Sequence, residues 1–172
     1  ICMWPDRAVA QEEDVLRMNP VYSGMLAFAE RSWRGGGQSG WIANVDDGDK
    51  KSFIDFENRL LDHKKQFFKH KIFHYAKQSN LVWKLYGPYP NNGNLTKPFL
   101  PETKSWNEAT AKVYKEQTGG TIVLRHWWAP LIKGAIDKPE DSTTWYATTK
   151  IWADEDGIKN FWIGFNNISR SP

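Results

Sequence analysis

The first half of the chain carries apolar residues at the spacing of an amphipathic helix. The stripe follows Asn19 and Pro20, a pair typical of a helix start, because proline lacks the N–H that the first helical turn leaves unsatisfied. Its members recur three or four residues apart: Tyr22, Met25, Leu26, Ala29 and Trp33. Three glycines at 35–37 then stop the pattern. The sequence predicts a helix from Asn19 to Trp33 that packs on something apolar.

A longer amphipathic pattern follows a polar turn at Asp46–Asp49. Ser52, with Asp55 three residues on, resembles a capping box in which aspartate replaces the usual glutamate or glutamine. The predicted helix runs from about Phe53 to about Gln78. Its apolar side comprises Phe53, Phe56, Leu60, Phe67, Ile72 and Tyr75.

Beyond Asn80 the apolar positions form short runs rich in aromatic and β-branched residues, separated by Pro, Gly, Asn and Asp. Such runs are typical of an antiparallel sandwich or jelly roll. The predicted strands are 81–86, 111–114, 121–128, 144–152 and 161–165, and Asp154–Gly157 is a hairpin loop between the last two. Five strands are few for a sandwich, so we expect this domain to be incomplete or closed by another copy of the chain.

Composition excludes several classes of protein. Hydrophobic residues make up 40% of the 172 residues, which indicates a globular protein. Lys and Arg number 23 against 20 acidic residues and are spread along the chain, so we expect no nucleic-acid partner. Apolar runs are too short for a membrane span. The single Cys2 excludes an internal disulfide and predicts a small buried residue.

Few residues are candidates for metal or nucleophilic chemistry. His70 and His74 have the i, i+4 spacing of a metal pair and His63 lies on the same helix, but nothing completes a site, so a solvated face is favoured. The Asp46–Asp49 loop lacks the ligand spacing of a calcium site and is interpreted as a turn. Nucleophile-elbow and phosphate-loop motifs are absent. The sequence therefore predicts no metal site and no cofactor.

The opening run Ile1–Trp4 reads as a strand. If it is a parallel barrel strand, Trp4 and Asp6 stand at its carboxyl end, where barrel active sites are built. An aromatic wall beside a carboxylate suits a sugar, because the ring packs on the apolar face while the carboxylate accepts hydroxyl hydrogen bonds. The ten tryptophans of the chain suit either sugar stacking or a sandwich core.

Three sets of residues together resemble one enzyme family. Met3-Trp4 and Asp6, then Ala27 to Trp33 (Ala-Phe-Ala-Glu-Arg-Ser-Trp), then Arg59 to His63 (Arg-Leu-Leu-Asp-His) resemble the last strand and last helices of the family-twenty glycoside hydrolases, the β-N-acetylhexosaminidases. The segments 83–89 to 101–102 and 161–167 resemble the β-rich domain that follows the barrel in bacterial members. The resemblance implies an α+β chain: residues 1–80 are the end of a TIM (β/α)8 barrel, and residues 81–172 are an incomplete β-sandwich domain.

The resemblance also implies roles for single residues. Trp4 matches the pocket tryptophan of the last barrel strand, and Asp6 stands where the family usually has a hydroxyl-binding glutamate, with Pro5 in place of a common glycine. Both are expected to bind substrate, although the shorter Asp6 puts that contact or the substrate preference in doubt. The family removes terminal N-acetylhexosamine from glycans by substrate-assisted retaining hydrolysis. No residue here matches its catalytic Asp–Glu pair, so this chain alone is expected to be inactive, and its parent to be periplasmic or secreted.

A competing hypothesis makes the chain a noncatalytic carbohydrate-binding or structural module. Its sugar platform would come from aromatic residues of the β-rich half: Trp127, Trp128, Trp145, Trp152 and Trp162. The exposed apolar sides of the two predicted helices also make a homo-oligomer an expectation.

Overall fold

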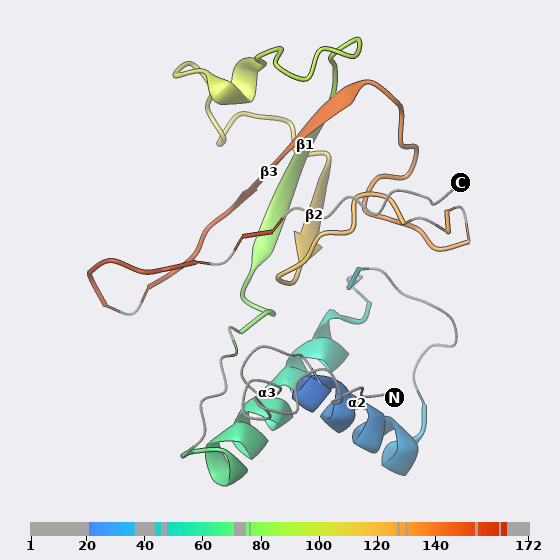
Figure 1. Ribbon diagram of the computed structural model, residues 1–172, viewed down its shortest axis with the longest axis vertical. Helices are drawn as coiled ribbons and strands as arrows, with labels where there is room; N and C mark the ends of the chain where they lie inside the picture. Colours follow the sequence, from blue (N-terminus) through green and yellow to red (C-terminus); the bar gives the residue numbers. More distant parts are fainter. Residues whose placement is uncertain are drawn as a thin grey trace, which may run out of the picture. The chain divides into compact units, whose positions relative to one another are not determined.

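The computed structural model describes residues 21–36, 44–45, 48–70, 75, 77–126, 128–129, 131–153, 155–161 and 163–164. This part of the chain is an α+β protein with two α-helices and one three-stranded antiparallel sheet (Figure 1). It divides into two compact units. The helical unit contains both helices and continues to Ser79, and the β unit contains 44–45 and the chain from Asn80 onward. None of the described helices has the length and apolarity that a membrane crossing requires.

Helix α2 covers Val21–Arg34 and confirms the first predicted helix. The predicted start at Asn19 and Pro20 lies outside the described residues. The glycine stop is confirmed, because Gly35 and Gly36 have φ of 65° and 73°, and the Gly35 N–H donates to the Arg31 carbonyl at 2.9 Å. Of the predicted apolar stripe, Leu26 is half-buried, whereas Trp33 is 91% exposed.

Helix α3 covers Lys50–Phe67 and is shorter than the predicted 53–78. It begins three residues earlier than expected, with Asp49 as the residue before its first turn, so the predicted capping box at Ser52 is wrong. Asp55 instead accepts a hydrogen bond from Lys51 Nζ at 2.6 Å. The backbone leaves the helix at Phe68, and Ile72 lies outside the described residues.

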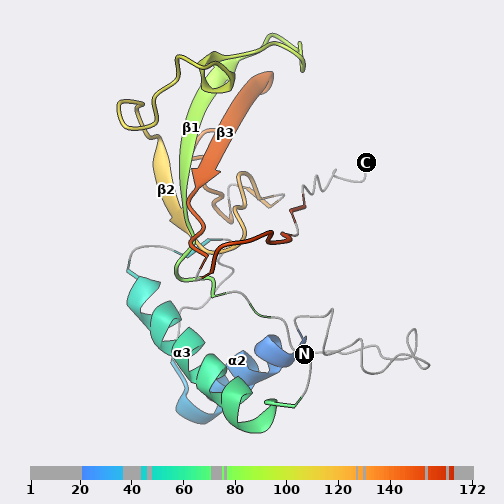
Figure 2. The same cartoon turned by 90° about the vertical axis from the view of Figure 1, so that its left-hand side faces the viewer.

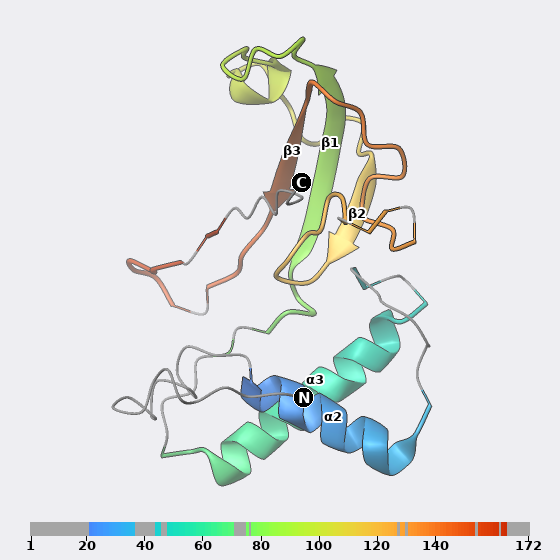
Figure 3. The ribbon, with the colours of Figure 1, turned by 45° about the vertical axis from the view of Figure 1, so that its right-hand side comes forward.

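The two helices pack against each other around Leu60, which is 2% exposed (Figures 2 and 3). The half-buried residues around it come from both helices and from the segment after α3: Leu26, Phe56, Leu61, Phe68 and Tyr75. The apolar core of this unit is therefore small.

The β unit is built on strands β1 (Val82–Pro90), β2 (Lys115–Thr118) and β3 (Thr143–Thr149) in the order β2-β1-β3 (Figure 1). Both pairs are antiparallel, with Leu85 opposite Lys115 and Tyr86 opposite Tyr146. The predicted strands at 81–86 and 144–152 are confirmed, although β1 continues to Pro90 and β3 ends at Thr149.

The other predicted strands need correction. Residues 111–114 form a bend, and β2 occupies the next four residues, Lys115–Thr118. The described residues of 121–128 are irregular, with a bend at 124–125 and a turn at 128. The Val123 and Leu124 carbonyls accept hydrogen bonds from the Ala135 and Ile136 N–H groups outside any ladder. The described residues of 161–165 are not in a strand either. The described part of the chain contains one three-stranded sheet, and neither a two-sheet sandwich nor a barrel is seen in it.

A bulge in β1 fixes the direction of its side chains. Two residues, Gly87 and Pro88, lie opposite the single residue Trp145 between the pairs Tyr86–Tyr146 and Tyr89–Thr144. Gly87 has φ of 143°, and a Cβ there would lie 2.8 Å from Trp145 Cε3, so only glycine fits. Because of the extra residue, Tyr86 and Tyr89 lie on the same face of the sheet.

Candidate functional site

The predicted substrate-binding residues Trp4 and Asp6 both lie outside the described residues. Of the matched motifs, the structure describes Ala27–Trp33 in α2 and Arg59–His63 in α3. The functional geometry of this chain must therefore be built from the contacts of these helices and of the sheet.

A two-point ion pair joins the two helical motifs. Arg59 donates from Nε to Glu30 Oε2 at 2.8 Å and from Nη2 to Glu30 Oε1 at 2.6 Å. The Arg59 hydrogen bond holds the pKa of the Glu30 carboxyl below its usual value, and Glu30 raises the pKa of Arg59. Arg34 lies 4.0 Å from the same carboxylate. Glu30 is thus held as an anion with arginine partners, an arrangement suited to fixing two helices rather than to moving a proton.

Glu57 is the buried carboxylate of the helical unit, with 0% of its surface exposed. It accepts hydrogen bonds from Tyr75 Oη at 2.9 Å, from the Gln78 N–H at 2.5 Å and from the Ser79 N–H at 3.0 Å. Burial raises the pKa of the Glu57 carboxyl, but the hydrogen bonds from Ser79, Gln78 and Tyr75 together lower it below its usual value. Burial, and then Glu57 itself, raises the pKa of Tyr75.

Sequence reasoning missed Glu57, because a glutamate in the middle of a charged helix reads as surface. Its three donors come from 18 to 22 residues further along the chain. A fully buried carboxylate with three donors is ionised and inaccessible to a substrate. Glu57 therefore holds the segment 75–79 against α3, at the point where the chain leaves the helical unit.

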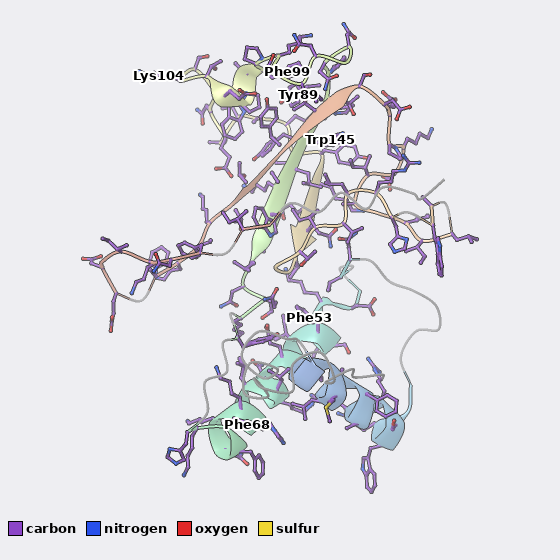
Figure 4. All side chains as sticks on the ribbon, in the orientation of Figure 1. Phe53, Phe68, Tyr89, Phe99, Lys104 and Trp145 are labelled. Carbon is purple, nitrogen blue, oxygen red and sulfur yellow. The ribbon has the colours of Figure 1, made fainter. Side chains whose placement is uncertain are left out.

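Aromatic side chains cover one face of the sheet in the β unit. The Tyr86 and Trp106 ring centroids are 5.3 Å apart with an edge-to-face geometry, and Tyr89 packs edge-on against Tyr146 at 5.5 Å. Phe99 lies beside Tyr89 at 5.3 Å (Figure 4). We refer to these five residues as the aromatic cluster. The only sequence signal for it was the excess of aromatic residues.

Two polar side chains at the cluster, Tyr146 and Lys97, are paired with groups of the same unit. Tyr146 Oη donates to Glu102, and burial followed by this bond raises the pKa of Tyr146 to about 12. Lys97 Nζ lies 5.1 Å from the Phe99 ring centroid and donates to the Pro90 carbonyl at 2.9 Å. A sugar stacking on that face of Phe99 would have to displace Lys97. The cluster is therefore suited to fixing the long connection between β1 and β2 on the sheet.

The connection is fixed at a second point by a charged residue. Glu108 lies 3.6 Å from Lys84 Nζ of β1 and accepts a hydrogen bond from Thr148 Oγ1 of β3 at 3.3 Å. Lys84 and Thr148 are opposite each other in the ladder, so one carboxylate bridges the two strands. This face of the sheet is closed by its own connection.

The tryptophans of the alternative sugar platform lie in different settings. Trp145 packs edge-on against Tyr114 with a centroid distance of 4.8 Å, which makes it a packing residue (Figure 4). Trp128 is 37% exposed and lies near His126, and Trp152, beyond the end of β3, is 92% exposed. Trp127 and Trp162 lie outside the described residues. Of the described members, Trp152 alone presents nearly its whole side chain.

Of the candidate histidines, His63 lies on α3 and contacts aromatic rings, whereas His70 lies beyond the end of α3 and is exposed. His63 lies 4.5 Å from the Phe67 ring and 6.1 Å from the Phe68 ring, centroid to centroid. His74, Asp46 and Asp47 lie outside the described residues. Within the described ranges, no three His, Cys, Asp or Glu residues come together in a way that could hold a metal ion.

Comparison of the chain with protein-family models, with curated proteins and with solved structures finds no match in any of the three.

Proposed function

We propose that this chain belongs to a glycoside hydrolase of the family-twenty type, which removes terminal N-acetylhexosamine from glycans. In this proposal residues 1–80 form the last strand and last helices of the catalytic barrel, and residues 81–172 form the β-sandwich-like domain that follows it. A periplasmic or secreted location would follow from the family. The chain supplies one wall of the sugar pocket through Trp4 and Asp6, and the catalytic Asp–Glu pair lies elsewhere in the enzyme.

The observation that carries the proposal is the pairing of Glu30 with Arg59. The motifs 27–33 and 59–63 are both part of the resemblance, and the ion pair that the structure describes between the two helices joins them. This contact supports the interpretation of the two motifs as neighbouring parts of one structure. The order of the elements, helices first and an antiparallel sheet second, also agrees with what the resemblance implies.

The chemistry of the proposed pocket makes a clear demand on the substrate. In substrate-assisted hydrolysis the sugar's own acetamido oxygen attacks the anomeric carbon, so a glycoside without that group cannot react by this route. Trp4 would pack on the sugar ring, and the Asp6 carboxylate would accept hydrogen bonds from its hydroxyls.

The test uses the full-length protein encoded by the gene that contains this chain. We expect turnover of 4-nitrophenyl N-acetyl-β-glucosaminide and none of 4-nitrophenyl β-glucoside. Asp6→Asn should lower kcat/KM by about 10- to 100-fold, the value of a hydrogen bond to a charged group. The control is Glu155→Gln, which removes a carboxylate from an exposed loop and should leave kcat/KM unchanged. Equal activity on both glycosides would refute the proposal, and the 172-residue chain alone should show no turnover.

A noncatalytic sugar-binding module is the second candidate, and the 92% exposure of Trp152 favours it. An exposed indole offers a flat apolar face to a sugar ring. Titration of the chain with N-acetylglucosamine oligomers, followed by tryptophan fluorescence, distinguishes the two. A saturable change that Trp152→Ala abolishes and Trp33→Ala preserves supports the module. Trp33 is the matched control because it is 91% exposed but lies on α2.

A further inference from the structure

Strand β3 forms an open edge of the sheet. In the order β2-β1-β3, it pairs with β1 on one side, and no described residue forms a ladder with its other side (Figures 1 and 3). The opposite edge is different. There Thr118 of β2 forms a bridge with Val45, and Gln117 Nε2 donates to the Val45 carbonyl at 2.7 Å. Among the described residues, one edge of the sheet is covered by its own chain and the other has no pairing strand.

The open edge lacks the features that keep edge strands apart. Natural edges are usually protected by charged residues, proline or a β-bulge, and the bulge of the β1–β3 pair lies in β1. Thr143–Thr149 reads Thr-Thr-Trp-Tyr-Ala-Thr-Thr and contains neither a charge nor a proline. Ala147 is exposed and small, so it does not block a further strand.

The strand is also complementary to itself when it runs antiparallel. With Tyr146 at the centre, threonines meet threonines and the large Trp145 meets a small residue, which are favourable cross-strand combinations. The pairs on one half of the two-fold axis are Thr143 with the partner's Thr149, Thr144 with the partner's Thr148, Trp145 with the partner's Ala147, and Tyr146 with the partner's Tyr146.

The charges that flank the strand fit the same register. Asp141 precedes β3 and Lys150 follows it, and both side chains are exposed. In the antiparallel pair, the end of β3 that carries Lys150 lies beside the partner's turn at Asp141 and Ser142. Opposite charges therefore meet at both ends of the pair, and this charge complementarity favours a second copy over an unrelated strand.

We propose that β3 is a self-association edge, through which two copies of this chain pair β3 to β3 in antiparallel orientation and form one continuous six-stranded sheet. The interface is isologous, so it closes as a dimer. The proposal does not depend on the glycosidase assignment. It also differs from association through the apolar side of α2, where Met25 and Phe28 are 51% and 57% exposed.

The first test measures the sedimentation of the chain over a wide range of concentration. The unaltered chain should form a dimer, and Ala147→Lys should weaken the dimer by more than about tenfold, because it brings two like charges to the shared edge. Ala147→Thr is the matched control, which keeps the edge neutral and should dimerise like the unaltered chain. Far-ultraviolet circular dichroism verifies that both variants fold.

The second test uses the flanking charges and needs no change within the strand. Asp141→Lys and Lys150→Asp should each weaken the dimer, and the double variant should restore it, because the exchanged charges again meet across the two-fold axis. This rescue is specific to the antiparallel register.

Three outcomes would overturn the proposal. A chain that stays monomeric at all concentrations does so. A dimer that resists Ala147→Lys but is broken by Met25→Lys would assign the interface to α2 instead. A dimer weakened by the single charge changes but not restored by the double variant would exclude the antiparallel β3 pair.

Discussion

The helical unit and the β unit are stabilised by different kinds of contact. In the helical unit, the buried interior consists of Leu60, its half-buried apolar neighbours and the carboxylate of Glu57. In the β unit the buried side chains include apolar and aromatic ones, such as Leu85 and Tyr86, and neutral polar ones, Asn91, Gln117 and Thr118. Its irregular segments are held by hydrogen bonds between side chains and backbone. Asn44 illustrates this pattern, since its amide both donates to the Val123 carbonyl and accepts from the Val123 N–H, each at 3.1 Å.

The comparison shows how a chain with little apolar core fixes its irregular segments. In the helical unit, three hydrogen bonds converge on the buried Glu57 carboxylate. The position of the segment 75–79 therefore depends on this one residue. The β unit distributes the same task over several groups. They include the charged Glu108 and the neutral Trp83 Nε1, which donates to the Gly119 carbonyl at 2.9 Å. We therefore expect point substitutions to have concentrated effects in the first unit and local effects in the second.

The strongest way to break the helical unit is to neutralise its buried anion. Glu57→Gln keeps the side-chain volume but places an amide NH₂ among N–H and O–H donors. We expect a loss of about 3 kcal/mol in the free energy of unfolding of this unit, because buried donors lose their acceptor. Urea unfolding followed by helical circular dichroism measures it. Asp62→Asn on the same helix is the control and should change stability by less than about 0.5 kcal/mol, since Asp62 is exposed.

The same carboxyl should make this unit sensitive to acid. Because the folded-state pKa of Glu57 lies below its usual 4.5, the stabilisation is present above pH 4.5 and is lost as the pH falls through the folded-state pKa. Hydrogen exchange of the Gln78 and Ser79 amides should accelerate relative to intrinsic rates over that range. In Glu57→Gln the acceleration should disappear, and an unchanged pH profile in that variant would contradict the assignment.

The corresponding destabilising substitution in the β unit is Gly87→Ala. The new Cβ would lie 2.8 Å from Trp145 Cε3 at a φ of 143°, so we expect a loss of about 2 to 3 kcal/mol from steric overlap and strain. Gly93→Ala separates the two causes, because Gly93 has φ of 80° with no atom within 4 Å, and should cost only about 1 kcal/mol. Near-ultraviolet circular dichroism during urea unfolding reports on this unit. Equal losses for the two variants would mean that Trp145 does not pack on Gly87.

A smaller effect of opposite sign is expected at Tyr86. Its ring is 1% exposed, and its hydroxyl oxygen is buried without a hydrogen-bond partner among the described residues. Tyr86→Phe should therefore stabilise the β unit by up to about 1 kcal/mol. Tyr114→Phe is the matched control and should destabilise it, because Tyr114 Oη accepts from the Asp137 N–H at 3.2 Å. Destabilisation by both variants would show that Tyr86 has a partner.

The smallest effect should come from the ion pair between the two helices. The side chains of Glu30 and Arg59 are 24% and 45% exposed, so solvent screens their interaction. A double-mutant cycle with Glu30→Gln and Arg59→Gln should give a coupling energy of about 0.5 kcal/mol that high salt removes. A coupling energy above about 2 kcal/mol would contradict this prediction and would show that the pair stabilises the helical unit as strongly as Glu57 does.

Local pattern predicted the elements whose contacts are close in sequence. The apolar spacing around Leu26, the glycine stop at Gly35 and the aromatic runs of β1 and β3 all use periodicities of a few residues, and these elements are present. The site residues Trp4 and Asp6 were proposed from a resemblance alone, and their placement stays a prediction. No local pattern indicated Glu57 or the aromatic cluster, because their partners lie far away in the chain.

The sequence by itself determined that helices at 21–34 and 50–67 precede a β-rich part after Asn80, because hydrophobic periodicity is a property of neighbouring residues. Only the tertiary structure decided where α3 ends and where β2 lies. Tyr75 fits the apolar spacing of a longer helix. In the structure, however, its hydroxyl and the backbone N–H groups of Gln78 and Ser79 donate to Glu57, which holds residues 75–79 against α3. Lys115–Thr118 has poor strand propensity, but its pairing with β1 and the Gln117 bond to Val45 make it a strand. In both places, hydrogen bonds between distant residues outweigh local preference.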